Sequence, residues 1–238
     1  MINKETIIKE ITYYYDNKDN HKIMSALFAK GNMFKLTITE EQKNSEFIHA
    51  YAMANLEAGN NNFGFLMIST KNDTVGNFSN FDDNTKDYVY ESIQKEKFPV
   101  PNSVTEYNIE ESNNPDQITW REAEERITRW NNWIDTSESK GIFRAFIIPT
   151  VDVEFGVEHN CFLAMRNDKG VLIADLLVVN YQTNKIVSRN ISTTIINIED
   201  MVRPVPPFKS SMASVETVVS SYGNFGIFNY IWPLPIKL

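Results

Sequence analysis

The sequence predicts an α+β protein made of two similar units, each a helix packed on a small, mainly antiparallel sheet. Three observations predict this class. Helical periodicity alternates with hairpin-like apolar stretches, the same order of features occurs twice, and 238 residues that are 42% hydrophobic can bury a sizeable core. The units are expected at residues 1–114 and 115–238, the second ending in an apolar tail.

The first unit opens with a helix over residues 3–17. Asn3 has the side chain of an N-cap, and Ile7, Ile11 and Tyr14 recur at helical spacing. We therefore expect an amphipathic helix that ends near residue 17.

The rest of the first unit is expected to be mostly β. Short apolar stretches are separated by Gly- and Asn-containing turns, and the turn at 59–62 predicts a hairpin. In order, the expected segments are β-stretches at 23–29 and 33–38, a strand or helix at 47–56, a strand at 63–69, a loop at 70–86, a short helix at 87–96, an extended Pro segment at 98–101 and a polar linker at 102–117.

The second unit repeats this order. Thr119 and Glu122 form a capping-box pattern, and Ala123, Ile127 and Trp130 trace one face of the helix that follows. In order, the later segments are expected as a strand at 143–148, a short helix or irregular link at 152–157, a hairpin of 161–166 and 171–181, a partly extended stretch at 186–198 and an extended Pro segment at 203–207. The shared order favours a diverged tandem duplication.

Residues 118–207 also carry a set of short motifs. These are Ile118-Thr119, Glu122-Ala123 and Trp130 in the helix, Ala145-Phe146-Ile147-Ile148-Pro149 in the strand, Asn167-Asp168-Lys169-Gly170 in the turn, and Pro204-Val205-Pro206-Pro207. In these motifs the chain resembles a group of small uncharacterised Flavobacterium-type proteins. The resemblance implies the architecture of this unit, with the first unit as its diverged copy, and no activity. Val205 stands where that family has cysteine, so no thiol or metal chemistry is carried over.

Charge and cysteine content exclude several classes. The net charge is −8 with no run of Lys or Arg, which disfavours nucleic acid as a partner. Cys161 is the only cysteine, so an internal disulfide or a cysteine metal cluster cannot form. No apolar signal segment follows Met1, and the longest apolar run, 171–179, is too short for a membrane span. A cytoplasmic location is expected, with export by a route lacking a cleaved signal left open.

The candidates for catalysis or ligand binding are few. His159 and Cys161 would share a strand face, and Asp152, Glu154 and His159 are the residues that a hydrolase or metal site would use. No sequence motif for a cofactor or metal is present, so a structural role for these residues is favoured. Trp133 is expected to be exposed, which makes a small-ligand or carbohydrate-binding module the alternative function.

The tail is the strongest functional signal in the sequence. Six large apolar side chains of this tail are its candidate interaction residues, and Pro233 and Pro235 are expected to keep the end extended. They are Phe225, Ile227, Tyr230, Trp232, Leu234 and Ile236. Such a tail covers its own core or docks on a partner chain by strand addition. The favoured function is a non-catalytic structural or protein-interaction protein that self-associates through this tail, and no cofactor is expected.

Overall fold

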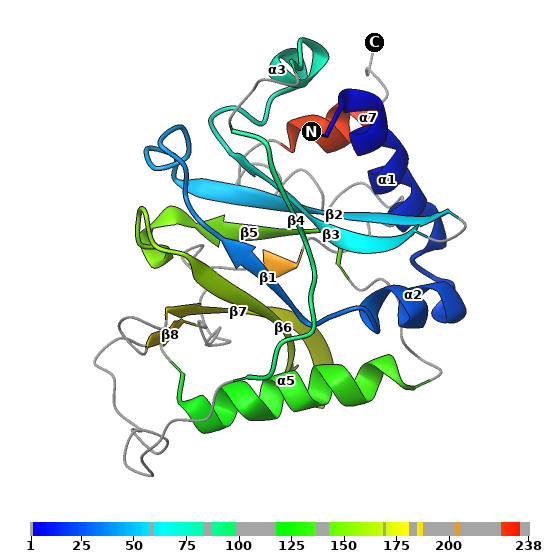
Figure 1. Ribbon diagram of the computed structural model, residues 1–238, viewed down its shortest axis with the longest axis vertical. Coiled ribbons are helices and arrows are strands. Elements are labelled where there is room, and N and C mark those ends of the chain that lie inside the picture. Colours follow the sequence, from blue (N-terminus) through cyan, green and yellow to red (C-terminus); the bar gives the residue numbers. More distant parts are fainter. Residues whose placement is uncertain are drawn as a thin grey trace.

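Two antiparallel sheets lie face to face, and helices cover their outer sides (Figure 1). The structure is a computed structural model that describes residues 2–57, 60–82, 87–98, 118–136, 143–168, 170–180, 185–187, 203–204 and 225–233. The α+β class and the antiparallel sheets are confirmed.

The larger sheet has five strands in the order β4-β3-β2-β5-β9. Its strands are β2 (Phe47–Glu57), β3 (Asn60–Ser69), β4 (Val89–Ser92), β5 (Ala145–Pro149) and β9 (Arg203–Pro204). The smaller sheet has four strands in the order β1-β6-β7-β8. Its strands are β1 (Met33–Leu36), β6 (His159–Asp168), β7 (Val171–Asn180) and β8 (Lys185–Val187).

Each sheet takes strands from both halves of the chain. In the smaller sheet β1 pairs with β6, with Phe34 opposite Cys161. In the larger sheet β5 pairs with β2, with Phe146 opposite Ala50. β1, the first strand of the first half, thus joins β6, β7 and β8 of the second half. β5, the first strand of the second half, joins β2, β3 and β4 of the first half. This corrects the expectation of one sheet per unit. The boundary at residue 114 lies outside the described residues, and the duplication itself stays a prediction.

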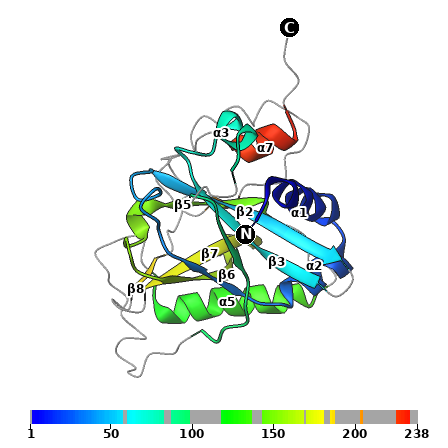
Figure 2. The ribbon, with the colours of Figure 1, turned by 45° about the horizontal axis from the view of Figure 1, so that its top comes forward.

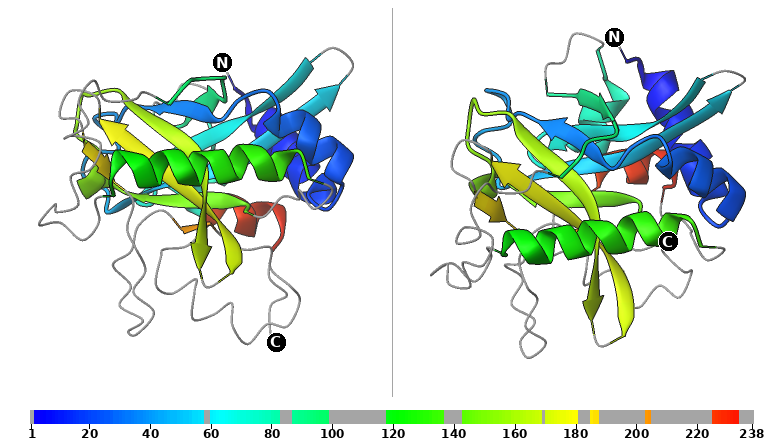
Figure 3. Two further views of the ribbon diagram at one scale, coloured as in Figure 1. Left: turned by 90° about the horizontal axis from the view of Figure 1, so that it is seen from below. Right: turned by 60° about the horizontal axis from the view of Figure 1, so that its bottom comes forward.

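The helices form the outer layers (Figure 2). Helix α1 (Lys4–Asn17) packs on β2, and α5 (Trp120–Ile134) packs on β6, so each long helix covers strands from its own half. Figure 3 shows α5 lying across the β6–β7 hairpin. The remaining helices are α2 (His21–Phe28), α3 (Val75–Ser79), the 3₁₀ turn η1 (Thr150–Asp152) and α7 (Gly226–Ile231).

The main core lies between the two sheets. The inward side chains of β2 are small at Ala50, Ala52 and Ala54, and they leave room for aromatic rings from neighbouring strands, such as Phe65 and Phe146. Both β2 and β6 are buried on both faces, because each has the other sheet on one side and a helix on the other. This explains why the segment at 47–56 reads as a continuous apolar run in the sequence.

The predicted helix starts are confirmed at both long helices. Asn3 Oδ1 accepts a hydrogen bond from Thr6 N at 2.8 Å, and Thr119 Oγ1 accepts one from Glu122 N at 3.1 Å. The hairpins β2–β3 and β6–β7 are also confirmed.

Two short segments differ from the prediction. Residues 23–29 were expected to be extended, but 21–28 form α2, capped by Asn20 Oδ1, which accepts from Ile23 N at 3.3 Å. Residues 87–96 were expected to be helical, but 89–92 form β4 at the sheet edge. In both cases tertiary packing overrides a weak local preference, because the apolar pattern of a run of four to eight residues fits the helical period and the strand period about equally well. The Pro segment at 99–101 and the linker at 102–117 lie outside the described residues.

Candidate functional site: the docking face of residues 225–232

The apolar tail packs on its own chain. Phe225 and Ile227 are buried, while Tyr230 and Trp232 are partly buried against the outer side of the larger sheet. Residues 226–231 form helix α7, so this part of the tail is not the added strand that the sequence suggested. The end that Pro233 and Pro235 are expected to keep extended lies, after Pro233, outside the described residues. Leu234 and Ile236 lie outside the described residues.

We call the surface that receives residues 225–232 the docking face. It comprises the outer side of β2, β3 and β5, the adjoining side of α1, and the turn at 73–74 before α3. Its apolar side chains include Tyr51, Met53, Leu66, Ile68, Ala145 and Ile147 from the sheet, and Ile7 and Ile11 from α1. Alternating residues of a strand point to one side, so the sheet residues among them point away from the main core and toward the layer that α1 and the tail form.

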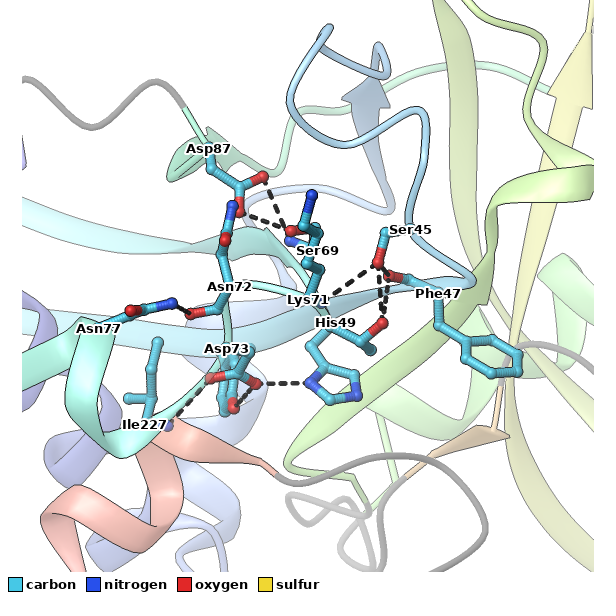
Figure 4. Close-up of polar contacts among 12 residues, drawn as sticks. Ser45, Phe47, His49, Ser69, Lys71, Asn72, Asp73, Asn77, Asp87 and Ile227 are labelled. Atoms are coloured by element: carbon cyan, nitrogen blue, oxygen red, sulfur yellow. Dashed lines mark hydrogen bonds and ion pairs between the residues drawn. The ribbon is translucent and has the colours of Figure 1, made fainter.

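A buried polar cluster lies within the docking face (Figure 4). His49 Nδ1 donates to Asp73 Oδ2 at 2.5 Å, and the Tyr51 hydroxyl donates to the same oxygen. Ile227 N donates to the other oxygen, Asp73 Oδ1, at 3.1 Å. The side chains of Asp73, His49 and Tyr51 are each at most 1% exposed. The carboxylate is therefore removed from water and depends on these donors, one of which belongs to the tail.

Asp73 takes the place of an N-cap for α7. The N-cap residue Phe225 makes no side-chain cap, and the carboxylate of Asp73 accepts from an N–H in the first turn instead. Its negative charge also lies at the positive end of the helix dipole. A six-residue helix is unstable alone, so α7 depends on the docking face for its structure.

Local hydrogen bonds hold Asp73 in place. The end of β3 turns at Ser69, whose carbonyl accepts from Asp73 N at 2.9 Å, and Thr74 then caps α3 by accepting from Asn77 N at 3.0 Å. Asp87 is a second buried carboxylate and accepts from the Ser69 hydroxyl at 2.7 Å. Figure 4 shows both acidic side chains near the end of β3.

The environment fixes the protonation of Tyr51. Burial, and next the charge of Asp73, raise the pKa of the Tyr51 hydroxyl well above its ordinary value. Tyr51 therefore keeps its proton and remains a donor to the carboxylate over the physiological pH range.

Aromatic contacts fix the tail at the polar cluster. The Phe225 ring lies parallel to the His49 ring, with centroids 3.9 Å apart and an interplanar angle of 13°. Phe228 meets Tyr51 edge to face at 4.6 Å. Gly226 lies between them, and a Cβ there would come within 2.5 Å of Thr74 Cα. Only glycine permits so close an approach of α7 to the turn before α3.

Further aromatic and cation–π contacts hold the other end of the tail. Trp232 packs on Tyr15 of α1 with centroids 4.8 Å apart, and Tyr15 in turn covers the guanidinium of Arg144. Tyr230 packs on Phe78 of α3, and Lys4 Nζ lies 4.5 Å from the Tyr230 ring centroid. Residues 225–232 thus contact α1, α3 and the sheet, and Figure 1 shows α7 beside α1 and α3.

His159 and Cys161, which the sequence offers as candidates for catalysis, have structural surroundings, and Glu154 meets His159 through its backbone N–H. The side chain of Asp152 lies outside what the structure describes. Both ring nitrogens of His159 bond the backbone: Nε2 accepts from Glu154 N at 3.2 Å, and Nδ1 donates to the Val157 carbonyl at 3.0 Å. Burial lowers the pKa of His159 and raises that of the Cys161 thiol. His159 is therefore held neutral in a structural role, and Cys161 is a buried thiol in the main core. Within the described residues, no group of three or more His, Cys, Asp or Glu side chains is placed to hold a metal.

Trp133 is not an exposed platform. It is 8% exposed and packs against Phe28 and Trp130, so the expectation of exposure is wrong. A groove of about 450 Å³ lies nearby, between the ends of α2 and α5 and residues 95–97. Its charged lining side chains balance, with Lys95 and Lys97 against Glu96 and Asp135, so the groove favours no class of charged ligand.

Sequence reasoning missed the polar cluster. Asp73 lies in an Asn-rich stretch that reads as a solvated loop, and the sequence separation from His49 and Tyr51 matches no known motif. The available signal is the occurrence of His49 and Tyr51 at alternate positions within an otherwise apolar strand. Side chains that share a strand face and carry polar groups into a buried layer need a partner.

Comparison with family models found no match to this chain, and the searches of curated proteins and of solved structures found none either. The resemblance of residues 118–207 to Flavobacterium-type proteins stays a prediction. Among the helices of the described ranges, none has the length and apolar character needed to cross a bilayer.

Proposed function

We propose that this chain is a non-catalytic protein-interaction protein that self-associates by exchanging residues 225–232 between copies. The observation that carries the proposal is the complementarity of the tail and the docking face, which includes a hydrogen bond from Ile227 N to the buried Asp73. A contact that closes within one chain forms equally well between two identical chains, which makes exchange of such a segment a low-cost route to dimers.

The length of the connecting chain is compatible with either arrangement. Twenty residues separate Pro204 from Phe225, and such a segment spans up to about 70 Å when extended. For a connecting segment of about this length, the attached tail experiences an effective concentration on the order of millimolar. Exchange is therefore expected mainly at high protein concentration, or where the internal contact is weakened.

A complementation experiment tests the exchange without this internal competition. Gly226→Val disables the tail, because its side chain overlaps the backbone of Asp73 and Thr74, and leaves an intact docking face. Asp73→Leu disables the face and leaves an intact tail. Each variant alone is expected to be monomeric by light scattering at micromolar concentration, and their mixture is expected to form a 1:1 dimer.

The control mixes Gly226→Val with a chain carrying both substitutions, which offers neither a working tail nor a working face; no dimer is expected. Circular dichroism establishes that each variant is folded. If the complementary pair stays monomeric at concentrations up to hundreds of micromolar, self-association through residues 225–232 is wrong. If a variant does not fold, light scattering of the unaltered chain from micromolar to millimolar concentration decides, and a constant monomer mass contradicts the proposal.

The small-ligand alternative has weaker support. Its predicted platform, Trp133, is buried, and the groove beside α5 carries balanced charges. The cytoplasmic location remains a prediction from the sequence.

A further inference from the structure

The docking face contains more specificity than a purely structural cover requires. An apolar sheet face is stabilised by any apolar segment of suitable shape, whereas a buried carboxylate is costly unless each bonding position is filled. Here Asp73 receives donors from His49 and Tyr51 on its own face and one from the backbone of the segment that covers it. A covering segment that offers no N–H at this position leaves Asp73 Oδ1 buried without that donor, which costs free energy. The docking face therefore favours segments that supply the N–H over segments that do not.

A size limit adds to this polar requirement. The backbone of the docked segment passes so close to the turn at 73–74 that a Cβ at position 226 would come within 2.5 Å of Thr74 Cα and 2.6 Å of the Asp73 carbonyl carbon. These are backbone atoms of a turn tied to β3 and α3, so they do not move aside as a flexible side chain does. Glycine is therefore required at this position of any segment that binds in the same way.

Aromatic and aliphatic positions on either side complete the pattern. The residue before the glycine stacks on His49, the next residue is fully buried as Ile227, and the one after it packs on Tyr51 as Phe228. The order is aromatic, Gly, aliphatic, aromatic at the first turn of a helix. Because α7 makes no cap of its own, a segment with this order gains its helix cap only on binding.

We propose that the docking face is a peptide-recognition site for segments of other proteins that begin a helix with aromatic–Gly–aliphatic–aromatic, and that residues 225–232 are its internal competitor. This inference rests on the proposed function, because it concerns the same face, but it names a different occupant and a recognition rule. Helices docked in apolar grooves through anchors on one face are a known mode of peptide recognition. Residues 225–232 keep the docking face covered until a segment of another protein binds there more tightly and displaces them.

The experiment uses the full-length Gly226→Val chain, whose own tail is disabled, and a fluorescent peptide with the sequence of residues 223–233. Anisotropy is expected to show saturable binding. The unaltered chain is expected to bind the same peptide at least tenfold more weakly, because its own tail occupies the face. A peptide carrying Gly226→Val is expected to bind the chain at least tenfold more weakly. Adding Asp73→Asn to the Gly226→Val chain is expected to lower its affinity for the unaltered peptide by a similar factor.

A second peptide tests whether the four-residue pattern is recognised rather than this one sequence. It keeps Phe225-Gly226-Ile227-Phe228 and replaces Tyr230 and Trp232, whose rings pack on α3 and α1, by Ala. Its affinity is expected to stay within about tenfold, which is what recognition of segments from other proteins through the four-residue pattern requires. A loss of tenfold or more would show that the face reads this tail alone and would overturn the inference.

Two other results also overturn it. One is a folded Gly226→Val chain that binds no peptide, and the other is equal binding of the Val-containing peptide. Should Gly226→Val fail to fold, hydrogen exchange of the Ile227 amide in the unaltered chain replaces the anisotropy measurement. Exchange is expected to accelerate when millimolar peptide displaces the tail, and unchanged exchange contradicts the inference. Peptide binding without a dimer in the complementation mixture would leave peptide recognition supported and self-association wrong, so the two failures are distinguishable.

Discussion

Asp73 links three parts of the molecule that lie far apart in the sequence. Its carboxylate joins β2, through His49 and Tyr51, to the start of α7, through Ile227 N. Its own backbone is held by the turn at the end of β3. A buried acid in this position gives the tail a defined register, because within the described residues Ile227 N is the N–H of α7 that reaches it.

Two glycines give a matched test of the close approach. We expect Gly226→Ala to destabilise the protein by about 1–3 kcal/mol, because the added Cβ overlaps backbone atoms of Asp73 and Thr74. Gly76→Ala, in α3, is the control: its Cβ would meet nothing nearer than 4.0 Å, so removal of a helical glycine is expected to be neutral or to stabilise by up to about 1 kcal/mol. Urea unfolding measures both. Equal effects of the two substitutions would refute the close-approach argument.

His159 predicts a pH dependence of stability. Its pKa in the folded protein is lowered by burial, whereas in the unfolded chain the imidazole titrates near 6.5. As pH falls below about 6.5 the unfolded chain takes up the proton first, so the free energy of unfolding falls with decreasing pH. The decrease levels off only below the folded pKa.

The measurement is unfolding by urea between pH 7.5 and 5, together with an NMR titration of the His159 ring. We expect a midpoint below 6.5 for the ring, and a shallower pH dependence of stability in His159→Gln. A ring midpoint at or above 6.5 contradicts the assignment of His159 as a buried neutral side chain.

At the scale of single elements, strong local signals predicted structure well. Helices α1 and α5 begin at the expected caps because Asn3 and Thr119 supply side-chain acceptors within three residues. The hairpins β2–β3 and β6–β7 follow from turn residues between apolar runs. These signals are local, so tertiary structure has little scope to override them.

Short elements were predicted poorly, for a physical reason. The segments at 21–28 and 226–231 complete no more than about two helical turns, and their structure depends on what they pack against. For α7 the decisive partner, Asp73, lies more than 150 residues away. The same distance explains why the polar cluster of the docking face was not predicted, although the apolar side chains of the tail are evident in the sequence.

Helix α5 provides a prediction at this scale. Arg126 is 2% exposed and bonds both Glu122, one turn before it, and Asp175 of β7 at 2.6 Å. Arg126→Met removes this guanidinium from the buried Asp175 and is expected to cost about 3–5 kcal/mol. The double variant Arg126→Met with Asp175→Leu removes both charges and is expected to recover most of that loss.

Thermal and urea unfolding of the two single variants and the double variant form a cycle that measures the coupling. If the double variant is as unstable as the sum of the single variants, the pair is not coupled and the description of α5 packing through this ion pair is wrong.

For the whole molecule, the pairing of strands is the feature that sequence patterns did not predict. The order of helix, strand and hairpin within each half is evident in the sequence. That order does not indicate whether β1 and β5 pair with strands of their own half or of the other half. β1 and β5 have apolar patterns that suit either sheet, and the choice depends on packing between residues more than 90 positions apart. Local periodicity carries no information on that choice.

The shared sheets predict that neither half folds alone. Residues 1–114 lack β5 beside β2, and residues 115–238 lack β1 beside β6, so each would expose the edge of a central strand. We expect each half to be unfolded or aggregated by circular dichroism and light scattering, and the two halves expressed together to assemble into a folded complex. A cooperative unfolding transition for either half alone would contradict this.

The crossed pairing of β1 and β5 also sets an order of events during synthesis. β1 leaves the ribosome about 125 residues before β6, its only paired strand in the smaller sheet, so at about 5–20 residues per second it waits roughly 6–25 s. Until then β1 lacks its ladder in the smaller sheet, and the contacts open to it are those with the first half, where Met33 pairs with Gln94 and Phe34 packs on Phe65. The nascent chain is thus most exposed to aggregation and to chaperones in the interval between the completion of the first hairpin and the arrival of the second.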